Sequence, residues 1–253
     1  LFLFAIIVNQ YFGNIGLFPH DSASHFDTGN RILYGEHPVK NYWIISGFII
    51  DYIQSLFFLL LGTNWQAYIF HASVFNGILT LFFFLFLRNF KLRLSYAIFF
   101  SFSFSILAYP SSATPFVDHH STFFSFLAIL FLIQALKFNK KIFWFLIPFL
   151  LSLSFLSKPV PAAYFIILIS LIIVSYVVLK KDHKPLLPLI LGCIISILSF
   201  LLIIFINDIK IFDFYNQYIL YPQSIGASRF SMFFKMNVLD ILSQYKFIFL
   251  LLF

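Results

Sequence analysis

The sequence predicts an all-α fold, a polytopic bundle of transmembrane helices. The chain of 253 residues is 61% hydrophobic and only 10% charged, whereas an average soluble domain is about 45–50% apolar and about 25% charged. A mean hydropathy of +0.96 also excludes a disordered chain. Several apolar runs approach the length of about 20 residues that a helix needs to cross a bilayer. The chain is therefore expected to be an integral membrane protein.

We expect about seven or eight membrane spans, with juxtamembrane helices on the outer face. The predicted spans are residues 1–18, 65–87, 94–110, 121–137, 142–157, 160–179 and 185–206, followed by a run that begins at about 247. Residue 1 is Leu, and the chain stops inside that last run. We therefore expect 1–253 to be a single membrane module that is truncated at both ends.

The basic residues predict the orientation of the spans. They gather in alternate loops, at residues 88–93, 137–141 and 180–184. Short loops rich in Lys and Arg stay in the cytoplasm, so the segments 19–64 and 207–246 are expected to face outward. All acidic residues except Asp182 then fall on the outer side.

The apolar run 44–62 could be read as a further span, but it holds Asp51 and Gln54 near its middle. An acid at the centre of a bilayer costs roughly 2.5–3.5 kcal/mol, and a further span would move all three basic loops outside. We therefore expect an amphipathic helix at the outer interface, with Asp51 at or near water. A polar helix at about 24–34 and a turn at 35–38 are expected before it.

The first outer segment offers two candidate site residues, Asp21 and Arg31. Asp21 directly follows the first span, where an acid costs free energy unless it is solvated or has a function. The structural alternative is that Asp21 caps the next helix, because Asp favours N-cap positions. The spacing alone leaves both interpretations open.

A second cluster, Asp118-His119-His120, ends a short outer loop. A carboxylate beside imidazoles suits proton transfer or a divalent metal ion, so Asp118 and His120 are candidate ligands of Mg²⁺ or Mn²⁺. Adjacent helical residues diverge by about 100°, so His119 and His120 do not easily bind one ion together. Capping of the next helix by Asp118 is the alternative, and the pattern leaves open whether any cofactor is bound.

Cations complete the set of candidate residues. Lys158 is expected at the outer tip of a hairpin between two spans, where it could contact a lipid phosphate or extend along the interface. Arg229, in the aromatic-rich segment 207–246, is a second candidate phosphate partner, and Arg31 is a third.

The order of these elements resembles the GT-C glycosyltransferases, which use polyprenyl-phosphate-linked sugars. The acid after the first span is followed by Arg31-Ile-Leu-Tyr-Gly-Glu-His-Pro38, an interfacial helix ending in Leu61-Gly62, and a second span. Leu156-Ser-Lys158-Pro-Val resembles the Leu-Thr-Lys-Gly-Pro-Val hairpin of bacterial protein mannosyltransferases and lipid A aminoarabinose transferases. Asp118-His119-His120 is similar to the second acidic motif of oligosaccharyltransferase catalytic subunits, a metal site in that branch. Ser22 departs from the Asp-Glu pair of many relatives, so a paired-carboxylate role is not carried over.

The resemblance implies that a sugar moves, with inversion, from a polyprenyl-phosphate donor to an unidentified lipid, glycan or protein acceptor. It makes Asp21 the catalytic base and Asp118 its partner or a metal ligand. The cations around the donor phosphate would be Lys158, Arg31 and Arg229. The expected place is the bacterial inner membrane with the active site on the outer, periplasmic or luminal, face, and no nucleic-acid partner is expected.

The alternative function is a membrane transporter or a lipid flippase. Such proteins tend to show internal repeats and ionisable residues near the bilayer midplane. Here the acidic residues cluster in the outer segments, and no repeat is visible in the sequence. These two observations favour the transferase.

Overall fold

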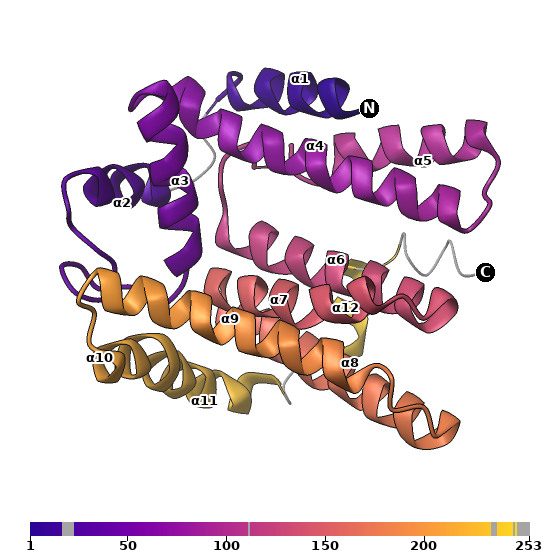
Figure 1. Cartoon of the computed structure of the whole chain (residues 1–253). Helices are drawn as coiled ribbons and strands as arrows, with labels where there is room; N and C mark the ends of the chain where they lie inside the picture. The colour runs from indigo at the N-terminus through magenta and orange to yellow at the C-terminus, as the bar shows by residue number, and fades with distance from the viewer. Residues whose placement is uncertain (17–22, 111, 234–236, 245, 247–253) are drawn as a thin grey trace.

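The computed structural model describes residues 1–16, 23–110, 112–233, 237–244 and 246, and within them it contains helices and no β-strand. This confirms the predicted all-α fold class. The axes of the main helices lie roughly parallel to one another (Figure 1). They are α1 (Phe2–Gly13), α4 (Trp65–Asn89), α5 (Leu94–Leu107), α6 (Val117–Phe138), α7 (Lys141–Ser157), α8 (Pro159–Lys180) and α9 (Leu186–Ile206).

Four helices, α4, α6, α8 and α9, are long and apolar enough to cross a membrane. The apolar helices α1, α5 and α7 are shorter, with 12, 14 and 17 residues. Most side chains of α8 and α9 stay exposed, as expected for helices that face lipid. The span predicted from residue 247 lies outside the described residues. The span predicted at 121–137 begins earlier, at Val117, so Asp118 and His120 belong to the helix.

The two ends of the bundle carry different charges. The loops α4–α5, α6–α7 and α8–α9 lie at one end (Figure 1), and they hold the three groups of Lys and Arg. We call this end the basic end. The opposite end, where α2 (Ser24–Leu33), α3 (Phe48–Leu61) and the start of α6 gather, is called the acidic end. The basic loops that alternate along the sequence thus lie together at one end of the folded bundle.

Helix α3 runs across the long helices at the acidic end (Figure 1). It has 14 residues, fewer than the roughly 20 that a span requires. The expectation that Asp51 lies at or near water is wrong, because Asp51 is only 1% exposed. Neighbouring donors replace water around this carboxylate, as described below, and they remove the penalty on which the expectation was based.

The core lies between α4, α6 and α7, where aromatic and aliphatic side chains are buried together. Helix α9 packs on α7 through Gly192. A Cβ atom at this position would lie 2.3 Å from the carbonyl oxygen of Phe145. Glycine therefore permits the close approach of these two helices.

The segment 207–246, expected as a long outer loop, is mostly helical in its described residues. It contains α10 (Ile211–Tyr215), the π-helical turn η2 (Asn216–Leu220), α11 (Tyr221–Phe233) and α12 (Val238–Gln244). Gln217 of η2 accepts a hydrogen bond from Ile44 N–H at 3.2 Å and donates one to the carbonyl of Val39 at 3.0 Å. Tyr218 donates to the carbonyl of Leu156. The turn η2 therefore joins the loop before α3 to the end of α7.

Candidate active site

A cavity of about 790 Å³ opens at the acidic end of the bundle. Its walls come from segments far apart in sequence, namely α2, α3 and the loop before it, the start of α6, the α7–α8 junction and α11. Polar side chains lie on one part of the wall. They are Ser24, His25, Thr28, Ser46, Asp51, Asp118 and Lys158. Apolar side chains of α8 and α11 line another part, including Val160, Tyr164 and Ile225.

Lys158 and Asp118 form an ion pair on the cavity wall, with 2.6 Å between Nζ and Oδ1. Lys158 lies between α7 and α8 with an extended backbone, because Pro159 disfavours the helical conformation in the residue before it. Asp118 lies in the first turn of α6, where the helix dipole favours an acid. The two side chains keep 34% and 44% of their surface exposed. An anion in the cavity could therefore reach the ammonium group of Lys158.

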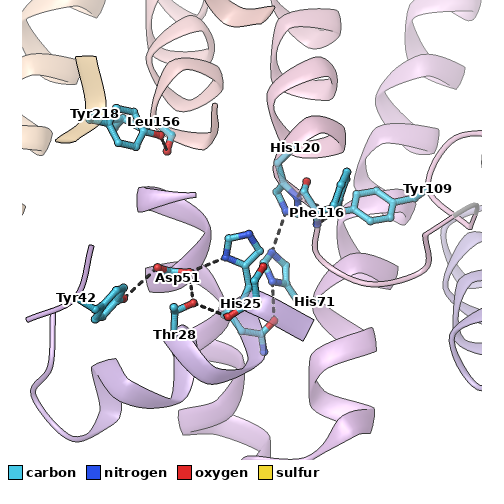
Figure 2. A network of polar contacts seen from close by, with 12 residues as sticks. His25, Thr28, Tyr42, Asp51, His71, Tyr109, Phe116, His120, Leu156 and Tyr218 are labelled. Atoms are coloured by element: carbon cyan, nitrogen blue, oxygen red, sulfur yellow. Dashed lines mark hydrogen bonds and ion pairs between the residues drawn. The ribbon is translucent and has the colours of Figure 1, made fainter. Parts of the chain in front are cut away.

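The carboxylate of Asp51 is held by three donors (Figure 2). Its Oδ1 accepts from Thr28 Oγ1 at 2.5 Å and lies 2.7 Å from Nδ1 of His25. Its Oδ2 accepts from the hydroxyl of Tyr42 at 3.0 Å. Burial and the neighbouring Asp51 raise the pKa of Tyr42 well above its ordinary value, so this hydroxyl stays protonated and donates. The network fastens α2 to α3 beside the cavity.

A second buried chain of hydrogen bonds crosses three helices (Figure 2). The hydroxyl of Tyr109 is 2.6 Å from Nδ1 of His120, and Nε2 of His120 is 3.1 Å from Nε2 of His71. Nδ1 of His71 is in turn 2.9 Å from Oε1 of Gln54. A single order of donors, from Tyr109 to Gln54, satisfies all three contacts with neutral imidazoles. Both ring nitrogens of His120 are thereby engaged, one by Tyr109 of the α5–α6 loop and the other by His71 of α4.

The structure brings together only part of the predicted site. Asp118 and Lys158 meet in the cavity. Arg31 instead pairs with Asp27 at 2.7 Å and with Glu36 at 3.1 Å, and it is not among the residues that line the cavity.

Two other predicted site residues are not compared with the cavity. Asp21 lies outside the described residues, and so does the side chain of Arg229. Position 229 itself is part of α11, one turn after Gly226, which lines the cavity.

The predicted metal ligands do not converge. His120 is fully buried and bound to Tyr109 and His71, whereas Asp118 faces Lys158. In the part of the chain that the structure describes, no group of three or more His, Cys, Asp or Glu side chains could hold a metal ion. Asp118 and His120 therefore do not fit a shared Mg²⁺ or Mn²⁺ site.

Sequence reasoning missed His25 and Asp51 as residues of the cavity. The available signal was the spacing of Asp51, Gln54 and Ser55, which places three polar residues on one face of α3. All three are buried. A polar face of this kind on an apolar helix indicates polar partners, which here are α2 for Asp51 and His71 of α4 for Gln54.

The fold and the site together define the class of this protein: a helical membrane bundle with a charged cavity at one end. Residues 37–203 match the model of the family described as dolichyl-phosphate-mannose-protein mannosyltransferase. The match covers more than half of the chain, which therefore belongs to this family and is a membrane glycosyltransferase of the GT-C type. It includes Asp51, Asp118 and Lys158 and begins after α2. Comparisons with curated proteins and with solved structures gave no significant match.

Proposed function

We propose that this glycosyltransferase moves a sugar from a polyprenyl-phosphate donor to a lipid, glycan or protein acceptor, with inversion, on the outer face of a bacterial inner membrane. The observation that carries the proposal is the Lys158–Asp118 ion pair, which is open to a cavity at the acidic end. The basic end is expected in the cytoplasm by the positive-inside rule. A cavity at the opposite end then faces outward.

The cavity offers separate surfaces for the two halves of such a donor. Lys158 supplies a cation for the phosphate. Val160 and Tyr164, on the first turns of α8, are 51% and 68% exposed, and Ile225 of α11 lies on the same cavity wall. These apolar residues lead from the charged site to the exposed surface of α8, where a lipid chain would lie.

The proposed reaction needs a positive charge beside the departing phosphate, and the geometry of the cavity supports this. The acceptor oxygen attacks the anomeric carbon from the face opposite the phosphate, and the bond to the phosphate oxygen breaks with its electron pair on that oxygen. The phosphate thereby gains negative charge, so a fixed cation stabilises the transition state more than the bound donor. Lys158 would provide this cation, and Asp118 would hold it in place. By family resemblance, Asp21 remains the candidate for the base that accepts the proton of the acceptor.

The test is sugar transfer by the full chain in lipid vesicles, with a radiolabelled polyprenyl-phosphate mannose as donor. Lys158→Ala should weaken donor binding about ten- to a hundredfold, because a hydrogen bond to a charged group contributes about 1.5–3 kcal/mol. Lys40→Ala is the matched control, since Lys40 also forms an ion pair, at 3.3 Å from Asp208, but does not line the cavity.

Two results would contradict the proposal. One is equal donor binding by the wild type and Lys158→Ala. The other is movement of the labelled lipid across the vesicle membrane without any transfer of its sugar, which would favour a flippase.

A further inference from the structure

We propose that the indole of Trp43 stacks on the sugar ring of the donor, and that the hydroxyl of Ser46 binds a hydroxyl group of the same sugar. This inference rests on the proposed function and adds a sugar subsite to the same cavity. Both residues belong to the loop before α3, and both line the cavity. Neither was expected from the sequence to be a site residue.

Trp43 leaves most of its surface uncovered although it lines the cavity. It is 60% exposed. The other two tryptophans are engaged within the fold, since Trp144 is 1% exposed and Trp65 is half-buried and donates its Nε1–H to the carbonyl of Gly13 at 3.1 Å. Trp43 is therefore the tryptophan that offers a large ring surface to this cavity.

The backbone on both sides of Trp43 is held in place. Tyr42, the residue before it, donates its hydroxyl to Asp51 at 3.0 Å. Ile44, the residue after it, is buried and donates its N–H to Oε1 of Gln217 at 3.2 Å. A side chain on a fixed backbone has less freedom to lose when a ligand binds, so the entropic cost of binding is reduced.

One aromatic neighbour orients the indole. Tyr221, the first residue of α11, packs against Trp43 with 5.4 Å between the ring centroids and 86° between the ring planes. This edge-to-face arrangement is a favoured geometry for aromatic pairs, and it covers at most one face of the indole. Trp43 therefore keeps an open ring face in a defined orientation.

The chemistry of this part of the wall matches a pyranose ring. The C–H groups on one face of such a ring are slightly positive, and the face of an aromatic ring is negative. The rim of the sugar carries hydroxyl groups, which need hydrogen-bond partners. Among the residues that the structure describes, none forms a hydrogen bond with the hydroxyl of Ser46, which can both donate and accept.

The position of the subsite fits a sugar that is bonded to a phosphate. Lys158, the proposed phosphate cation, lines the same cavity as Trp43 and Ser46. One ligand could therefore contact all three residues. An isoprenoid chain would use the indole but has no group for the hydroxyl of Ser46, so the pair of residues favours a sugar over a lipid chain.

Quenching of tryptophan fluorescence by acrylamide tests whether the sugar covers Trp43. The full chain in lipid vesicles is measured alone, with polyprenyl-phosphate mannose, and with polyprenyl phosphate that lacks the sugar. The difference between the wild type and Trp43→Phe gives the signal of Trp43. Its quenching should fall at least about twofold with the mannose donor, because a pocket covers most of its ligand's surface, and should stay unchanged with polyprenyl phosphate.

Two results of the quenching experiment would overturn the inference. Equal protection by polyprenyl phosphate would show that the lipid chain or the phosphate covers the indole. Quenching of Trp43 by brominated lipid but not by acrylamide, with or without donor, would show that this residue only anchors the protein at the membrane interface, where Trp is common.

Substitutions at the subsite separate stacking from simple burial of apolar surface. Trp43→Leu should weaken binding of the mannose donor about two- to tenfold, whereas Trp43→Phe, which keeps an aromatic face, should bind nearly as the wild type. Ser46→Ala should weaken it by a similar factor through the lost hydrogen bond. Tyr34→Leu is the matched control, because Tyr34 is 79% exposed and does not line the cavity.

Binding of polyprenyl phosphate should be unchanged in all of these variants. If Trp43→Leu weakens binding of polyprenyl phosphate as much as binding of the mannose donor, Trp43 does not recognise the sugar and the inference is wrong. A wild type that neither binds the mannose donor nor transfers its sugar would instead refute the proposed function. Binding and transfer with Trp43 still open to acrylamide would refute the sugar subsite alone.

Discussion

Replacement of Asp118 by Asn tests whether this acid holds Lys158 for catalysis or only begins a helix. The substitution keeps the shape of the side chain but removes the charge that lies 2.6 Å from Nζ of Lys158. Because both side chains are more than one third exposed, the pair contributes only about 0.2–1 kcal/mol to stability. An acid in the first turn of a helix adds about 0.3–1 kcal/mol. The free energy of unfolding should therefore fall by about 0.5–2 kcal/mol.

The effect on transfer should be larger than the effect on stability. Loss of a preorganised electrostatic contact costs on the order of 10²–10³ in turnover. Asp118→Asn leaves Lys158 present and removes only its alignment, so we expect turnover to fall at least about tenfold. Donor binding should not weaken, because the phosphate no longer competes with a carboxylate for Lys158. Single-turnover transfer at saturating donor, together with a donor titration, separates the two quantities.

Two outcomes would refute this reasoning. Wild-type turnover in Asp118→Asn would show that the acid serves only the start of α6. Donor binding weakened as much as in Lys158→Ala, with normal turnover once donor is bound, would show that the pair acts as a single binding element.

Three further predictions follow from the fold and from the arrangement of the site. In a Cys193→Ser background, Ser224→Cys should react with an impermeant thiol reagent from outside and Asn139→Cys should react only after permeabilisation; the reverse pattern would invert the orientation of the bundle. Gly192→Val should cost about 1–3 kcal/mol of stability through overpacking against the Phe145 carbonyl, 2.3 Å from the added Cβ, whereas Ile190→Val at an exposed position should have little effect. Transfer should persist in a chelator, because Asp118 and His120 face different partners; activity lost in chelator and restored by Mn²⁺ or Mg²⁺ would refute this.

The helices were predictable because their physical cause is local. A membrane helix must be apolar over its whole length, and this requirement is visible in the runs that became α4, α8 and α9. The charge of the connecting loops predicts which helix ends lie on the same side of the membrane, and this does not require knowledge of how the helices pack. The start of α6 was placed too late because the polar residues 118–122 precede the apolar run, although an acid in the first turn of a helix is favourable.

The site was only partly predictable because its contacts join distant segments. Lys158 and Asp118 were each expected to be functional, but no spacing relates residues that are separated by a complete helical hairpin. Asp51 was expected at or near water because an isolated acid is expensive to bury. The donors that make its burial acceptable come from α2 and from the preceding loop, and their proximity follows from tertiary structure.

The π-helical turn η2 gives this enzyme a means of reshaping its cavity by a change in chain length. A π-turn holds one residue more than an α-helical turn, and η2 directly precedes α11, which contributes Pro222, Ile225 and Gly226 to the cavity wall. Deleting one residue within Asn216–Leu220 would convert the turn to ordinary α-helix and rotate α11 by about 100° about its axis. Those three residues would leave the wall, and a neighbouring face of α11 would replace them. Relatives that differ by one residue here would thus present different surfaces to their substrates on an otherwise unchanged bundle.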